Sequence, residues 1–134
     1  YALYETADGR HLAVGSLEFK FFKRLLELAG ATDLLKLPLA PGAKGEPLRQ
    51  ALKALFKQRT RDEWEALLAH EDTCVSGILT LDEALENEQV KARELVEQVN
   101  GKPAIALPIR FSHAQATRGE APALGAHTEE VLRR

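Results

Sequence analysis

Hydrophobic and polar residues follow two different periods along the chain, and the change of period predicts which segments form strands and which form helices. In residues 1–16, β-forming residues lie on both sides of Asp8-Gly9, a dipeptide typical of the type I′ turns that join paired strands. A second hairpin is predicted with strands at 95–99 and 103–111, on both sides of Asn100-Gly101.

Between these hairpins, apolar residues recur every three or four positions, which is the spacing of one helix face. The first predicted helix follows Ser16, expected as its N-cap, and ends before Gly30. Thr60 and Thr80 each begin a capping-box sequence with a glutamate three positions later, and so predict two further helix starts. The predicted helical segments are 17–29, 47–58, 60–68, 80–85 and 90–92.

The order of the elements predicts an α+β fold, in which antiparallel strands pack with helices. A short buried strand is predicted at 74–79, and residues 31–46, with their prolines and glycines, predict an irregular connection. Residues 112–125 show little periodicity and predict an extended linker or arm. Thr128 is expected to cap a short terminal helix.

Charge and composition exclude several classes of protein. The 134 residues include 18 basic and 20 acidic side chains, for a net charge of -2, whereas nucleic-acid-binding domains carry an excess of positive charge. The sequence has no apolar run long enough for a membrane span, no polybasic tract and no signal peptide. Its single cysteine excludes an internal disulfide and predicts a reducing, cytoplasmic setting.

The sequence contains no methionine and begins at Tyr1, inside a predicted strand. Because a natural gene product begins with Met, we expect the chain to be a piece of a longer protein.

Self-sufficient catalytic motifs are absent from the sequence, which has no nucleophile elbow, P-loop, dinucleotide-binding glycine motif or zinc-protease motif. Cys74 lies in an apolar run, which predicts a buried structural cysteine rather than a nucleophile. His11 and His70 are expected to be solvated, whereas His113 and His127 fall in the tail. We therefore expect no metal site.

Glu18 has an explanation that requires no chemistry. It follows Ser16 closely and is expected in the first helical turn, where the helix dipole favours a negative charge. Local propensity alone favours this structural role, and a functional role depends on a wider resemblance.

That resemblance extends along nearly the whole chain. In order, the sequence contains YETADGR at 4–10, LAVGSLEFKFF at 12–22, RTRDEW at 59–64, CVSGILTLDEA at 74–84, PIRFS at 108–112 and GAHTEEVL at 125–132. Together these stretches resemble the smaller domain and tail of the family III CoA-transferases and α-methylacyl-CoA racemases. The sequence departs from the family pattern at Phe19 and Gly77, where proline is common, and at Asn87, where histidine is frequent.

The resemblance implies a particular domain organisation. Residues 1–106 would form the small α+β domain, and residues 107–134 would form a linker and tail returning to a large Rossmann-like domain absent from this chain. The complete protein would be an interlocked homodimer that acts on an acyl-CoA substrate without a cofactor. Most contacts to CoA would lie in the missing part.

The resemblance also implies a role for Glu18. Racemisation removes the proton α to the thioester carbonyl and returns one on the opposite face, which requires acid/base groups beside that carbon. In the racemases the small domain supplies a glutamate beside a histidine of the large domain, and Glu18 matches that glutamate. Glu18 is thus the candidate catalytic residue, expected to orient the imidazole.

Two alternatives remain open. Transferases of the family move CoA between carboxylic acids through an aspartate nucleophile, and they more often carry a glycine-rich loop, which is not visible around Gly15-Ser16. Alternatively, the chain alone is an inactive domain for dimerisation and for covering the substrate.

Overall fold

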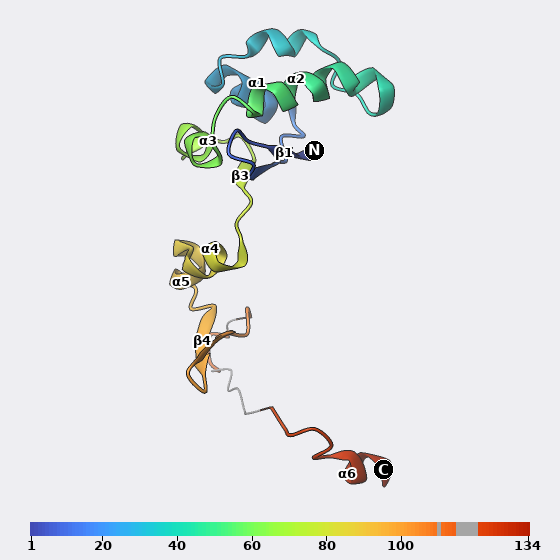
Figure 1. Cartoon of the computed structure of the whole chain (residues 1–134), viewed down its shortest axis with the longest axis vertical. Coiled ribbons are helices and arrows are strands. Elements are labelled where there is room, and N and C mark those ends of the chain that lie inside the picture. The colour runs from blue at the N-terminus through green and yellow to red at the C-terminus, as the bar shows by residue number, and fades with distance from the viewer. Residues whose placement is uncertain (110, 115–120) are drawn as a thin grey trace. The chain divides into compact units, whose positions relative to one another are not determined.

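The computed structural model describes residues 1–109, 111–114 and 121–134 (Figure 1). Internal contacts divide the chain into two compact units, Tyr1–Ile78 and Leu79–Arg134. The combination of helices with antiparallel sheets confirms the predicted α+β class. The domain boundary after residue 106 stays a prediction.

The first unit contains a three-stranded antiparallel sheet in the order β1 (Ala2–Glu5), β2 (His11–Val14) and β3 (Val75–Gly77). Leu12 lies opposite Tyr4 on one side and Gly77 on the other. Alternate residues on the strands face the protein interior, so Tyr4, Leu12 and Val14 are buried. The first predicted hairpin is therefore confirmed.

Three helices complete the core of this unit: α1 (Phe19–Leu28), α2 (Glu46–Phe56) and α3 (Arg61–Leu68). Their buried apolar residues join those of the strands in one cluster. At its centre the Phe56 ring lies 5.0 Å from that of Tyr4 and 5.2 Å from that of Trp64. The Trp64 indole N–H donates to the Phe56 carbonyl at 3.0 Å, so its polar atom is satisfied inside the core.

Two short 3₁₀ helices, η1 (Thr32–Lys36) and η2 (Gly42–Gly45), lie within the connection predicted to be irregular. The backbone carbonyl of Ala40 passes so close to Gly45 that a side chain at this position would overlap it. Glycine is therefore required at this approach.

The turn between β1 and β2 differs from the predicted type I′ turn. The Thr6 N–H donates to the Arg10 carbonyl at 2.8 Å, so the turn encloses three residues rather than two. Gly9 has a φ of 77°, whereas Asp8 does not have the positive φ that a type I′ turn requires of both its central residues. The Thr6 hydroxyl donates to the Asp8 carboxylate at 2.5 Å and stabilises the longer turn.

Ser16 does not cap α1, so that prediction was wrong. The helix begins at Phe19, and Glu18 occupies the N-cap position. The buried Ser16 hydroxyl instead donates to the Thr73 carbonyl at 2.5 Å. The capping boxes at Thr60 and Thr80 are confirmed, since each threonine side chain accepts a hydrogen bond from the backbone three residues later.

Cys74 is exposed, which contradicts the prediction of a buried structural cysteine. Its φ of 54° takes the backbone out of extended geometry, so β3 begins one residue later, at Val75. The strand is also shorter than predicted, and it ends at Gly77.

The second unit contains α4 (Leu81–Glu86), α5 (Glu88–Ala92), the hairpin of β4 (Val96–Val99) with β5 (Lys102–Ile105), and α6 (Thr128–Leu132). Val99 pairs with Lys102 around Asn100 and Gly101, whose φ values of 53° and 72° fit the predicted type I′ turn. The second strand ends at Ile105, earlier than predicted.

From Leu107 onward, every described residue is exposed. Residues 110 and 115–120, which belong to the stretches predicted as strand and extended arm, lie outside the described residues. Thr128 is the first residue of α6 rather than its cap, because His127 occupies the N-cap position. Within the described parts of the chain, no helix has both the length and the apolar character needed to cross a membrane.

Candidate functional site

Glu18 lies at the N-cap position of α1, with an extended backbone at φ −76° and ψ 137°. Its carbonyl begins the helix by accepting hydrogen bonds from the N–H groups of Phe21 at 3.1 Å and Phe22 at 3.2 Å. Its exposed side chain forms no cap hydrogen bond with the residues that the structure describes. The prediction of a first-turn position is thus corrected by one residue, and the carboxylate is available for an external partner.

The segment that carries Glu18 is tied to the connection before β3. The Ser16 hydroxyl binds the Thr73 carbonyl, and the Gly15 N–H donates to the Cys74 carbonyl at 2.8 Å. Leu17 then turns back, its N–H donating to the Gly15 carbonyl at 2.8 Å. These hydrogen bonds hold the backbone immediately before Glu18, so that the position of its carboxylate depends on the folded sheet.

Large apolar side chains flank Glu18 on both sides. Leu17 is 65% exposed and Phe19 is 62% exposed. The Glu18 carboxylate thus has an exposed apolar residue on each side in the sequence. This combination suits a ligand that carries both kinds of surface.

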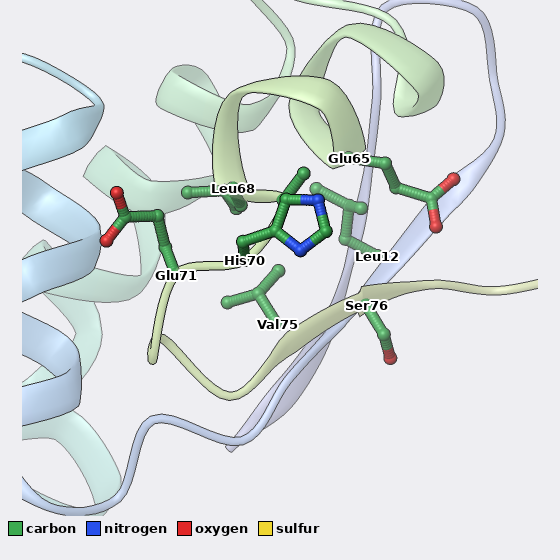
Figure 2. Close-up of a pocket in the computed structure, with 8 residues that line it drawn as sticks. Leu12, Glu65, Leu68, His70, Glu71, Val75 and Ser76 are labelled. Carbon is green, nitrogen blue, oxygen red and sulfur yellow. The ribbon is translucent and has the colours of Figure 1, made fainter.

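Apart from the Glu18 segment, an open pocket of about 300 Å³ is lined by His70 and its neighbours (Figure 2). In Figure 2 the side chains of Glu65 and Glu71 lie on opposite sides of the imidazole, and their carboxylates point away from it. Glu71 binds the Arg24 guanidinium at 2.8 and 2.9 Å, whereas Glu65 accepts from the Gly77 N–H at 3.2 Å. Both acids thus have structural partners, and the arrangement does not form a catalytic histidine–carboxylate pair.

The predicted exposure of His11 and His70 is confirmed, and the tail histidines His113 and His127 are exposed as well. Within the described residues, no three histidine, cysteine or acidic side chains come together as potential metal ligands. The absence of a metal site stays a prediction, and so does the role of Glu18.

Sequence reasoning did not identify the contribution of Arg61. It considered this residue only within a capping box and within the RTRDEW stretch at 59–64, but its guanidinium is buried. It donates to the Asp62 carboxylate at 2.8 Å and to the Ile78 carbonyl at 3.2 Å. The signal available in the sequence was a cation at an otherwise apolar helix face. The structure shows that Arg61 connects α3 to the residue that follows β3, which is a structural role rather than that of a reactive group.

Comparison with known proteins assigns the chain to a family. Its sequence matches CoA-transferase family III over residues 1–128, so the chain belongs to this family. Alpha-methylacyl-CoA racemase of Mus musculus is 32% identical over 99% of the chain, and the Homo sapiens racemase is 29% identical over 98%. The chain spans 36% and 35% of the lengths of these two relatives.

Solved structures show the same fold. A CAIB/BAIF family protein from Brucella suis, 28% identical, superimposes with a TM-score of 0.68 over 99% of this chain and 36% of its own. Rv3272 from M. tuberculosis, at 20% identity, superimposes with a TM-score of 0.73 over 95% of this chain and 37% of its own. At that identity the second likeness concerns the fold alone.

Proposed function

We propose that this chain is part of an α-methylacyl-CoA racemase. The observation that carries the proposal is the similarity to two proteins of that name, which extends over 98–99% of the chain. The complete protein would exchange the proton α to a CoA thioester in an interlocked homodimer. It would need no cofactor, because the thioester itself acidifies that proton.

Glu18 would act in this reaction through a histidine of the part of the protein outside this chain. Its exposed carboxylate and its fixed backbone support that role. The carboxylate would accept a hydrogen bond from one imidazole nitrogen and thereby direct the other nitrogen at the substrate. The enolate oxygen formed on proton removal would need hydrogen-bond donors, which we assign to the missing large domain.

CoA transfer between carboxylic acids is the second candidate, because the matching family bears the CoA-transferase name. The segment before Glu18 favours the racemase. Gly15 and Ser16 are held by Cys74 and Thr73 through short hydrogen bonds, and do not form a glycine-rich loop.

The complete protein, incubated with a single epimer of a 2-methylacyl-CoA in deuterated water, distinguishes the two activities. The racemase predicts deuterium at the α carbon together with formation of the other epimer. Transfer of CoA to an added free carboxylic acid, without α exchange, would instead establish the transferase.

The chain of 134 residues is expected to be inactive by itself, because one carboxylate does not supply acid/base groups on both faces of the substrate. The same deuterium assay tests this expectation. Exchange above background would show that the catalytic groups are within the chain.

A further inference from the structure

The face of the first sheet opposite the core carries a row of residues joined by strand register. Leu3 lies opposite Ala13, and Ala13 lies opposite Ser76. Because side chains alternate along a strand, this row faces away from the buried Tyr4 and Leu12. This row therefore has the large side chain of Leu3 at one edge and the small side chains of Ala13 and Ser76 at its centre and other edge.

A second row continues this surface beyond the strand ends. The Gly15 N–H donates to the Cys74 carbonyl at 2.8 Å. A methyl group placed on Gly15 would lie 3.5 Å from the Tyr1 ring and 3.9 Å from the Cys74 Cβ. Tyr1, Gly15 and Cys74 are thus neighbours, and the central position again lacks a large side chain.

Together the two rows form an open groove of about 410 Å³, here called the outer groove. Tyr1 and Leu3 lie on one side of it, with Leu3 64% exposed, and Cys74 and Ser76 lie on the other. Its volume falls in the range of small-molecule sites. No basic residue is among the described residues that line it, so its chemistry suits hydrocarbon and not the phosphates of CoA.

The outer groove is close to Glu18 along the chain. Gly15 precedes Glu18 by three residues, and three residues span at most about 11 Å even when fully extended. The exposed side chains of Leu17 and Phe19 flank the carboxylate. Two exposed apolar residues thus lie next to Glu18 in the sequence, within four residues of the groove.

We infer that the outer groove binds the hydrocarbon tail of the acyl-CoA substrate, remote from its thioester. The inference rests on the proposed function, because Glu18 then marks the position of the α carbon. Leu17 and Phe19 would contact the chain nearest that carbon, and Ala13 and Gly15 would form the floor beneath its tail. Occupancy of this groove would favour long acyl chains over short ones.

Cys74 provides a direct reporter, since it is the only cysteine of the sequence, is exposed and lines the groove. In the complete protein, with any other cysteines replaced, the rate of Cys74 alkylation by iodoacetamide is measured with and without S-decyl-CoA. This thioether cannot acylate the thiol. At about ten times its dissociation constant it should slow alkylation about tenfold, because bound ligand covers the thiol. CoA alone and S-ethyl-CoA should not protect.

Two variants distinguish ligand binding in the groove from binding elsewhere on the sheet. Ala13→Leu fills the floor and should abolish protection, whereas His11→Leu, on the same strand but outside the groove, should keep it. Circular dichroism confirms that both variants are folded. Equal protection of the wild type and Ala13→Leu, or protection by CoA alone, would overturn the inference.

A third measurement tests whether another part of the protein fills the groove in place of the substrate. If Cys74 reacts rapidly in the 134-residue chain but not in the ligand-free complete protein, another part of the protein covers the groove and the inference is wrong. These measurements need no turnover. If S-decyl-CoA protects Cys74 but the protein shows no α exchange, the proposed function is contradicted and tail binding in the groove still holds. If the protein shows α exchange but Cys74 is not protected, the proposed function still holds and tail binding in the groove is wrong.

Discussion

The Ser16 hydroxyl donates a 2.5 Å hydrogen bond to the Thr73 carbonyl, joining two buried residues that are 57 positions apart. It connects the segment before α1 to the segment before β3. Since Glu18 follows Ser16 by two residues, the same bond helps to position the candidate carboxylate.

Replacement of Ser16 by alanine should destabilise the protein. It leaves the buried Thr73 carbonyl without this donor, a loss of about 1–3 kcal/mol in the free energy of unfolding. Urea denaturation measures the change. Ser76→Ala, at an exposed position of the same sheet, is the matched control and should change stability by less than about 0.5 kcal/mol. Equal losses in the two variants would show that the Ser16 bond contributes nothing specific.

Glu18→Gln should slow α-proton exchange in the complete protein by roughly 10- to 1000-fold, an effect of the size of general acid–base assistance. Its stability should be nearly unchanged, because the side chain is exposed and makes no cap hydrogen bond among the described residues. The acid limb of the pH–rate profile should move to lower pH, since loss of a neighbouring negative charge lowers the pKa of an imidazole.

Glu27→Gln, at the other end of α1, is the control for this experiment. Its carboxylate is exposed and pairs with Lys23 at 3.7 Å and with Arg24 at 3.8 Å on the surface. It should keep normal exchange and an unchanged pH profile. Normal exchange in Glu18→Gln would limit Glu18 to beginning the helix.

Asp8 should make the stability of the first unit depend on acid pH. The Thr6 hydroxyl, followed by weaker backbone donors at Arg10 and Arg61, lowers the pKa of the Asp8 carboxyl in the folded protein. A lowered folded pKa means stabilisation that is complete above the unfolded pKa, about 3.9. That stabilisation is lost as the pH falls through the folded value.

Asp8→Asn should therefore be less stable than the wild type at pH 7, and the difference should shrink on acidification below about pH 4. Thermal melts across this range measure it. Thr6→Val removes the largest cause of the lowered pKa and should reduce the same pH dependence. A difference between Asp8→Asn and wild type that is constant with pH would contradict this origin.

Gly77→Ala should be destabilising because of Glu65. A Cβ at residue 77 would lie 2.6 Å from the Glu65 carboxyl carbon, so that side chain must move. Moving it weakens the hydrogen bond from the Gly77 N–H at 3.2 Å and the ion pair with Arg61 at 3.4 Å. We expect a loss of about 1 kcal/mol.

A double-mutant cycle tests this cause. In a Glu65→Ala background the clash is absent, so Gly77→Ala should cost clearly less than in the wild type. Equal costs in the two backgrounds would place the effect in the strand backbone and not in the contact with Glu65.

Local features of the sequence determined the elements that depend on neighbouring residues. The capping boxes beginning at Thr60 and Thr80 join groups three positions apart, and the Asn100-Gly101 turn requires only its own positive φ values. Whether these elements form therefore depends on residues within about three positions of one another. The resemblance to the family was likewise present in the order of short stretches, and the family match confirms it.

Tertiary structure decided the positions at which one side chain had a choice of partners. Ser16 has the residue type of a helix cap, but the Thr73 carbonyl, buried by folding, needs a donor, and satisfying it outweighs an exposed cap. Cys74 lies in an apolar run, yet the positive φ before β3 turns it to the surface. Both outcomes depend on how β3 joins β2, a contact between residues some sixty positions apart, and short-range patterns contain no information about such a pairing.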